Sequence, residues 1–428
     1  MFLGRLAERL AAQAKEVLGL REAFTRGQKR VFTVCFLCYA AAYVGRLNLS
    51  AALTGLADSL ALTDAQCGLF QTAFALVYAA GQIINGSLAD RISASRYIGV
   101  GLLLSALCNA LFGVTRSYGV LVALWALNGA AQSMLWTPIV KLLAAWFHGE
   151  RRSRASFGLS ITIILGHLVA WGVAGALASA LGWRYAFFVP TVVLAAAGAM
   201  ALLTLRDRPD DARDEPERPT APARFMPVGR MLRATGLAAL LGCCVCDGFV
   251  RDGVVTWAPM ILARGDGSLN PTLVSLIIPV LNLLGILLMR RCYRLLKGSA
   301  RGATGALMIV SAAFALLLLP TAAGGMLCAL LMGLCCAANY GVNPLLTTLV
   351  PMEYENAGRV GMVAGLIDSF IYVGSALAGV ATGALSDAAG WTGVYAVWGG
   401  VSLLAAALAF VSLRGLGALR GQEASKQA

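Results

Sequence analysis

Residues 31–57 read VFTVCFLCYAAAYVGRLNLSAALTGLA, and Arg46 is the one charged side chain in this stretch. A helix of about 20 apolar residues crosses the hydrocarbon core of a bilayer. The stretch therefore predicts a membrane-spanning helix that carries an arginine at depth. A charge inside the membrane is costly and generally faces a cavity or a partner, so Arg46 is the first candidate functional residue.

The rest of the chain has the same character: of its 428 residues, 59% are hydrophobic and 13% are charged. Soluble domains carry about 25% charged residues. Long unbroken apolar runs favour helices over the alternating strands of a membrane barrel. The sequence predicts an all-α membrane protein with twelve transmembrane helices, at 31–57, 67–89, 97–115, 118–147, 155–180, 185–205, 234–262, 272–289, 302–320, 325–350, 360–386 and 392–413.

A polar stretch between the sixth and seventh spans, which begins RDRPDDARDEPERP at residue 206, predicts a linker between two six-helix halves. The halves repeat each other: GALASALGW from Gly175 matches GALSDAAGW from Gly383, and Arg46 matches Arg251 at a similar offset. We expect an amphipathic cytoplasmic N-terminus (1–30) and a first six-helix half (31–205). A cytoplasmic linker (206–233) then leads to the pseudo-symmetric second half (234–413) and a cytoplasmic tail (414–428).

The basic residues predict the orientation in the membrane. Of the 34 lysines and arginines, 28 lie in segments that share one side with both termini, and only Arg116, Arg184 and Arg264 lie in the opposite loops. Cytoplasmic loops carry such an excess. We expect a multi-pass protein of the plasma (inner) membrane with both termini in the cytoplasm. This distribution explains the net charge of +13 without a nucleic-acid partner. The eleven cysteines show no metal-ligand spacing and are read as packing residues.

Three basic residues remain inside spans: Arg46, Lys141 and Arg251. Arg46 and Arg251 occupy matching positions in the first helix of each half. The planar fork of arginine binds phosphate oxygens in pairs, so the two residues predict an anion site between the halves. The alternative for Arg251 is a local ion pair, since Asp247 and Asp252 are close in sequence. Lys141 either supports the site or extends to the membrane surface.

Other polar residues within spans are weaker candidates. His167 either binds the anion and follows its protonation or bonds within the core. Asp247 and Asp368 are acids at membrane depth. Asp368 counters an arginine, carries a proton or meets a cationic part of the substrate. Four tyrosines indicate either a polar cavity or core packing: Tyr39, Tyr43, Tyr340 and Tyr372.

The loop after the second predicted span reads GSLADRISASRY. A glycine permits close helix approach there, and an acid with basic partners can hold helix ends together in one conformation. We interpret it as a gating motif rather than a substrate site, with Gly86, Asp90, Arg91 and Arg96 as its residues.

Together these motifs resemble the organophosphate:phosphate antiporters of the major facilitator superfamily over about residues 28–415. The resemblance is carried by Tyr39, Tyr43, Arg46 and Asn48 in the first span, by NGAAQSMLWTP from Asn128, by His167, and by Arg251, Gly253, Trp257 and Pro259. It implies a substrate site of both arginines, His167, Gln82 and the four tyrosines. Leu47 and Gln82 stand where glycerol-phosphate relatives carry lysine, so we expect a less positive cavity.

The resemblance implies a secondary transporter that moves a glycerol-3-phosphate or sugar-phosphate type of metabolite by alternating access, in exchange for inorganic phosphate. No catalytic or nucleotide motif is present, so neither an enzyme nor a cofactor is expected, and we expect a monomer. Two alternatives remain. One is a proton-coupled porter of another organic anion, with Asp368 or Asp247 as proton carrier. The other is a transporter-like membrane sensor of organophosphates.

Overall fold

The computed structural model describes residues 24–88, 92–147, 151, 155, 158–159, 162, 165–208, 228–264, 270–321, 325–354 and 360–415. Across these residues the regular structure is helical, without strands, which confirms the all-α class. Much of the predicted N-terminus, linker and tail lies outside the described residues. The last part of the predicted linker forms a short helix, α10 (Val228–Ala234), before the seventh span.

The first half begins with α2, which starts at Arg26 behind a capping box of Thr25 and Gln28. The fourth predicted span is divided into two helices at Met134 and Leu135. The fifth is described in part, and includes one turn of π-helix. The elements are α2 (Arg26–Leu60), α3 (Asp64–Leu88), α4 (Ala94–Val114), α5 (Tyr118–Ser133), α6 (Trp136–Trp146), η1 (Ala170–Ala174), α8 (Gly175–Leu181) and α9 (Tyr185–Thr204).

The second half ends in one long element that contains both of the last predicted spans. Gly390 divides it with φ 68° and ψ −179°, a conformation that glycine adopts without steric cost. The elements are α11 (Leu237–Ala263), α12 (Pro271–Ser275), α13 (Ile277–Leu295), α14 (Ala300–Leu317), α15 (Gly325–Pro344), η2 (Leu345–Leu349), α16 (Val350–Met352), α17 (Val360–Ser412) and η4 (Leu413–Gly415). Helical segments therefore occur in each of the twelve predicted ranges.

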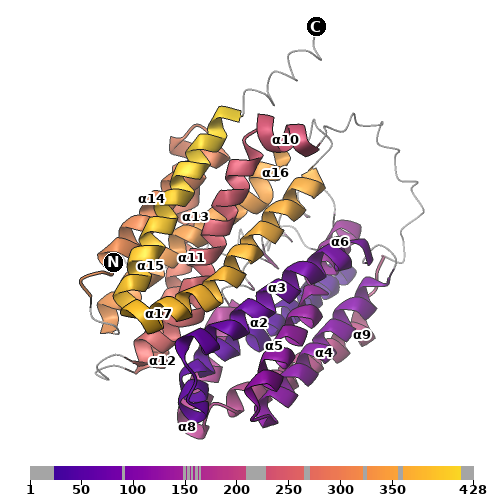
Figure 1. Cartoon of the computed structure of the whole chain (residues 1–428). Coiled ribbons are helices and arrows are strands. Elements are labelled where there is room, and N and C mark those ends of the chain that lie inside the picture. Colours follow the sequence, from indigo (N-terminus) through magenta and orange to yellow (C-terminus); the bar gives the residue numbers. More distant parts are fainter. Residues whose placement is uncertain are drawn as a thin grey trace, which may run out of the picture.

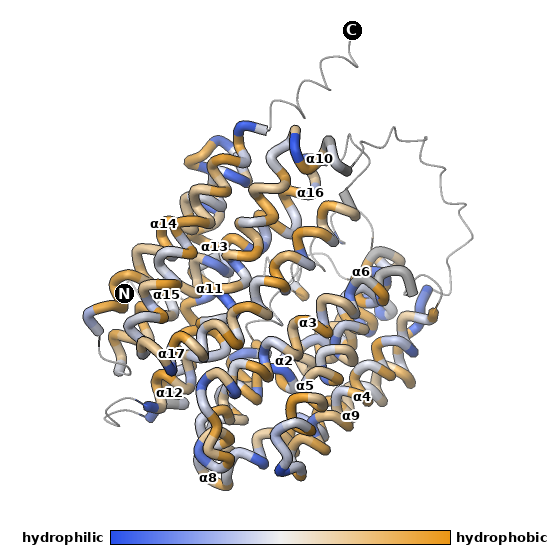
Figure 2. The backbone as a smooth tube through the Cα atoms, in the orientation of Figure 1, coloured by the Kyte–Doolittle hydropathy of each residue, from blue (hydrophilic) through white to orange (hydrophobic). Residues whose placement is uncertain are grey.

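In the described part of the chain, seven helices are long and apolar enough to cross a membrane. One of them contains both halves of α17. The helix α11 is also long enough to cross a membrane, at 27 residues. It is not among the seven because three charged residues lie close together within it: Asp247, Arg251 and Asp252. Figure 2 shows hydrophobic colour along most helices and hydrophilic colour at many helix ends and within α11.

The buried core shows how the halves meet. One apolar cluster joins both halves, with Phe70 and Trp125 from the first and Trp257 and Trp398 from the second. Two further clusters lie each within a single half. In Figure 1 the halves meet around α8 and α12 and diverge toward α6 and α10. We call the end around α8 and α12 the closed end.

A cluster of polar bonds joins the halves at the closed end. The Asp64 carboxylate accepts from the Arg264 guanidinium at 2.8 Å and from the Ser386 hydroxyl at 2.7 Å. The Asp387 carboxylate of α17 accepts from the backbone amides of Asp64 and Ala65 at 3.1 and 2.9 Å. The first amides of a helix lack acceptors within that helix, so Asp387 caps α3 from the opposite half.

Candidate functional site

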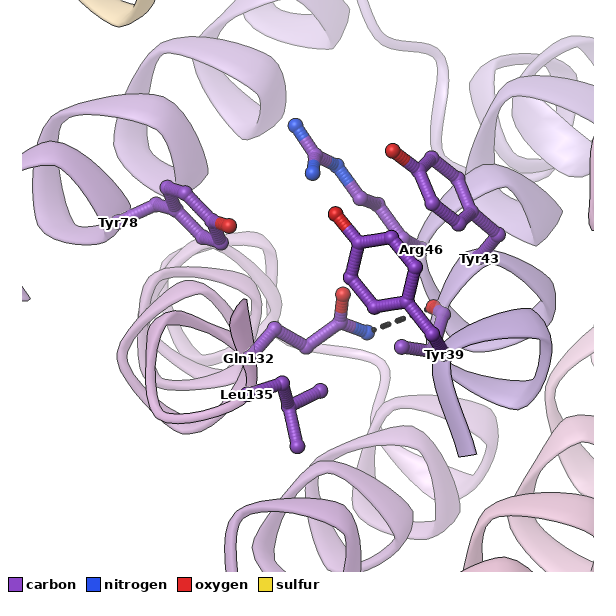
Figure 3. Close-up of a pocket in the computed structure, with 7 residues that line it drawn as sticks. Tyr39, Tyr43, Arg46, Tyr78, Gln132 and Leu135 are labelled. Carbon is purple, nitrogen blue, oxygen red and sulfur yellow. Dashed lines mark hydrogen bonds between the residues drawn. The ribbon is translucent and has the colours of Figure 1, made fainter. Parts of the chain in front are cut away.

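Arg46 lies in the middle of α2 beside a small, partly open pocket. Tyr39 and Tyr43 precede it on the same face of the helix, and their rings meet edge to face with centroids 5.2 Å apart. Figure 3 shows the hydroxyls of Tyr39, Tyr43 and Tyr78 on the side of the pocket where the guanidinium extends. One cation and several hydroxyl groups thus surround one space.

Amide side chains of neighbouring helices fix this part of α2. Gln132 donates to the carbonyl of Ala42 at 3.0 Å, and Asn128 and Asn109 donate to the carbonyl of Gly45 at 3.1 and 3.2 Å. These amides are buried, so the bonds form in a poorly solvated interior where losing one is expensive. They hold the backbone on either side of the pocket in place.

Aromatic rings from both halves surround the Arg46 guanidinium. Its Cζ lies 4.8 Å from the ring centroid of Phe74, 5.1 Å from that of Tyr78 and 5.5 Å from that of Tyr372. Its Nη1 donates to the Tyr372 hydroxyl at 3.3 Å. Within the described residues no carboxylate lies within ion-pair distance of Arg46. Most of its donors therefore remain available to an anion.

Arg251 is arranged differently, although it is the sequence counterpart of Arg46. It is 8% exposed, and its Nε and Nη2 donate to the two carboxylate oxygens of Asp252 at 2.8 and 3.1 Å. Asp247 lies one turn away, with an oxygen 3.9 Å from Nη1. The local ion pair considered from the sequence is thus formed, and Asp252 is its main partner.

The two further acids inside the membrane differ in burial. Asp247 is fully buried, and neither of its carboxyl oxygens has a hydrogen-bond partner among the described residues. Asp368 is half-buried on α17, the helix that also carries Tyr372. The second half therefore places acidic groups near Arg251.

His167 of the first half contacts the second half. It is 2% exposed, and its Nε2 lies 3.1 Å from the hydroxyl of Tyr340 on α15. Its ring also packs near Tyr43 and Trp171, at centroid distances of 5.8 and 5.9 Å. Tyr340 in turn lies under Arg251, with the guanidinium carbon 6.0 Å from the ring centroid. These contacts link His167 to Arg251 through Tyr340, and to the pocket beside Arg46 through Tyr43.

The remaining predicted residues lie at varying distances from the pocket. Gln82 donates to the Tyr78 hydroxyl at 2.9 Å and so contacts a pocket residue. Lys141 is exposed on α6 and does not line the pocket. In the gating motif, Gly86 lies in α3 and Arg96 is exposed in the first turn of α4. Asp90 and Arg91 lie outside the described residues.

Four residues that contribute to the site were not among the predicted site residues: Phe74, Tyr78, Gln132 and Asp252. Phe74 and Tyr78 precede Gln82 at intervals of four, which places all three on one face of α3. From this spacing, the sequence could have predicted that Phe74 and Tyr78 share the face of α3 that carries Gln82. Gln132 belongs to the NGAAQ motif, but it is uncharged, and charged side chains were the first signal of site residues within the spans. Asp252 was considered only as a rival partner of Arg251.

Comparisons with known proteins place this geometry in a family. The Major Facilitator Superfamily model matches residues 35–366. A probable hexose phosphate transport protein of Chlamydia trachomatis serovar D is 26% identical over 180 residues, which is 42% of this chain and 40% of the relative. The glycerol-3-phosphate transporter of Bacillus subtilis is 28% identical over 268 residues, 57% of this chain and 60% of the relative. The chain thus aligns with 40% to 60% of the length of these relatives.

A solved structure supports the same fold. The structure of a bacterial homologue of the human lysosomal transporter Spinster, inward-facing and unoccupied, superposes with a TM-score of 0.74 at 16% identity, covering 93% of this chain and 98% of that one. The resemblance to organophosphate antiporters is confirmed by the named relatives. Because the family model matches well over half of the residues, the chain belongs to the Major Facilitator Superfamily.

Proposed function

We propose that the chain is a secondary transporter of phosphorylated small metabolites, of the glycerol-3-phosphate or sugar-phosphate type, which it exchanges for inorganic phosphate. The observation that carries the proposal is Arg46. Its guanidinium reaches a pocket lined by hydroxyl groups, and its described surroundings contain no carboxylate partner. An ester phosphate offers oxygens to arginine and its alcohol groups offer hydrogen bonds to the tyrosines. The relatives' names support this class of substrate.

The mechanism follows from how the halves meet. They share a core at the closed end and have separate cores at the diverging end, an arrangement that gives the site access from one side. Rocking about the site would close the diverging end and open the other. The distribution of basic residues supports an orientation in which the diverging end, together with both termini, faces the cytoplasmic side of the plasma (inner) membrane. Binding and rocking involve no covalent step, so no catalytic residue is assigned.

Exchange rather than free movement follows from the charge of the site. An empty cavity holds Arg46 without a carboxylate, and desolvating that cation as the halves close is unfavourable. A bound anion removes the penalty. The return step therefore needs a second anion, and inorganic phosphate presents the same oxygens as the ester.

The test uses purified protein in liposomes loaded with inorganic phosphate and assayed for uptake of labelled glycerol-3-phosphate. Uptake is expected to require internal phosphate. Arg46→Lys is expected to lower it by on the order of tenfold or more, because lysine cannot provide the paired donors of the fork. Arg233→Lys, at an exposed position on α10, serves as the control.

Three other outcomes would contradict the proposal. Uptake that ignores internal phosphate and survives Arg46→Lys excludes phosphate exchange at this site. Uptake that follows a pH gradient alone, and is lost in Asp368→Asn, identifies a proton-coupled porter. Binding of the ester without any uptake identifies a sensor.

A further inference from the structure

The side chain of Asp252 occupies the anion-binding face of Arg251. Its two oxygens accept from Nε and Nη2 at 2.8 and 3.1 Å, which is the paired geometry that a bound phosphate or carboxylate adopts. Both residues are 8% exposed, so the pair is shielded from solvent. Asp252 therefore stands where the oxygens of a substrate anion would otherwise bind Arg251.

The charge available to a substrate follows from this pairing. Arg46 and Arg251 contribute two positive charges, and the ion-paired Asp252 removes one. Asp247 and Asp368 lie in the same half, Asp247 one turn from Arg251, and any charge on them lowers the total further. Arg46, Arg251 and Asp252 together thus offer one net positive charge, and the open guanidinium that carries it is Arg46.

Displacement of Asp252 by the substrate is unfavourable. A dianion that took both forks would leave the Asp252 carboxylate buried without its partner, and breaking a buried pair in this way is strongly destabilising. Asp247, which lies one turn from Arg251, is also an acid and cannot replace Arg251 as the partner of Asp252. The pair therefore persists when a substrate enters.

We propose that the site takes a singly charged phosphodiester, bound by Arg46, in preference to a doubly charged phosphomonoester, and that Asp252 determines this preference. The inference rests on the proposed organophosphate transport and moves its preferred substrate from a phosphomonoester to a phosphodiester. A phosphomonoester carries a charge of about −1.5 to −2 at neutral pH. A phosphodiester carries one charge shared by two free oxygens, which matches the single open fork.

Two ligands that differ by one charge test the inference: glycerol-3-phosphate and glycerophosphoglycerol, in which the same phosphate is esterified twice. Affinities are measured by calorimetry on the purified full chain in detergent at neutral pH. We expect the wild-type protein to bind the diester more tightly, by on the order of tenfold. Asp252→Asn frees the Arg251 fork and is expected to reverse the order, with a gain for the monoester.

Two further variants make the result specific. Asp252→Glu retains the carboxylate and is expected to keep the preference for the diester, which separates charge from folding. Asp58→Asn removes an exposed acid near the end of α2 and is expected to leave the affinity ratio unchanged.

The outcomes distinguish the inference from the function on which it rests. Tighter wild-type binding of the monoester overturns the inference while an organophosphate function stands. An unchanged ratio in folded Asp252→Asn, or reversal in Asp252→Glu, removes Asp252 as the determinant. Failure of both esters to bind, together with absent uptake in liposomes, removes the proposed function itself.

Discussion

Three buried or half-buried arginines show that the surroundings of a residue decide its role. Arg301 is fully buried, and its donors bond to Glu353 at 2.8 Å, to the carbonyls of Thr235 and Ser412 at 2.6 and 2.8 Å, and to the Tyr354 hydroxyl at 3.0 Å. Arg251 donates two hydrogen bonds to the Asp252 carboxylate. Arg46 makes one bond to a tyrosine. We infer a structural role for Arg301 and a binding role for Arg46.

Substitution of Arg301 tests the structural role. Arg301→Met leaves Glu353 and two carbonyls without their donor, so we expect a loss of about 3–5 kcal/mol in the free energy of unfolding, the usual range for breaking a buried pair. A thermal melt of the purified protein in detergent measures this loss. The control is Arg233→Met on the exposed face of α10, and equal melting of the two variants would contradict the assignment.

At the scale of helices, close backbone contact between α11 and α17 positions the site. A Cβ added at Gly248 would lie 2.0 Å from the carbonyl oxygen of Ile371, and one at Gly374 would lie 1.9 Å from that of Val245. No side chain fits at either position. This contact joins the helix that carries Arg251 to the helix that carries Tyr372, the partner of Arg46.

Gly248→Ala is therefore expected to push α11 away from α17, since backbone atoms cannot rotate aside as a side chain can. We expect a lower melting temperature and weaker binding of the substrate anion, measured on the same sample by melting and calorimetry. Gly365→Ala is the matched control, because Gly365 lies on α17 with nothing within 4 Å of an added Cβ. There alanine gains about 1 kcal/mol of helix propensity. Similar behaviour of the two variants would refute the packing argument.

At the scale of the molecule, the closed end behaves as a polar latch between the halves. It consists of Asp64, Arg264, Ser386 and Asp387, with Gly68 and Gly379 in close backbone approach beside them. All of these contacts must break for the halves to part at this end. The latch therefore stabilises the state seen here relative to the opposite one.

Cys67 reports on the latch, because it lies in α3 next to the capped turn and is 1% exposed. Asp387→Asn weakens the cap on α3, which is worth about 0.5–2 kcal/mol in an ordinary helix. We expect several-fold faster maleimide labelling of Cys67, quantified by mass spectrometry of its peptide. Asp58→Asn removes an exposed acid at the same end without touching the cap, and it should accelerate labelling much less, because it changes only the local charge near Cys67. No acceleration in Asp387→Asn would show that the cap does not hold this end closed.

The sequence by itself determined the helices and pointed to the residues of most chemical interest, and it predicted a division into two halves. Apolar runs of spanning length are sufficient to predict the helices, because a helix satisfies its backbone hydrogen bonds within one segment. Arg46 and Arg251 stood out because charge is rare at membrane depth. His167, Tyr43 and Tyr340, which the sequence proposed for the site, lie in contact, and their role in binding stays a prediction.

Only the tertiary structure decided which groups meet. Arg251 bonds to Asp252 rather than chiefly to Asp247, and Arg301, which the sequence placed with the loop charges, is fully buried. Asp387 caps a helix 323 residues earlier in the chain. Hydrophobicity and backbone hydrogen bonding are properties of a single segment, so a segment's sequence predicts them. Ion pairs, caps and glycine contacts between segments depend on the positions of several helices at once, and those positions exist only in the folded protein.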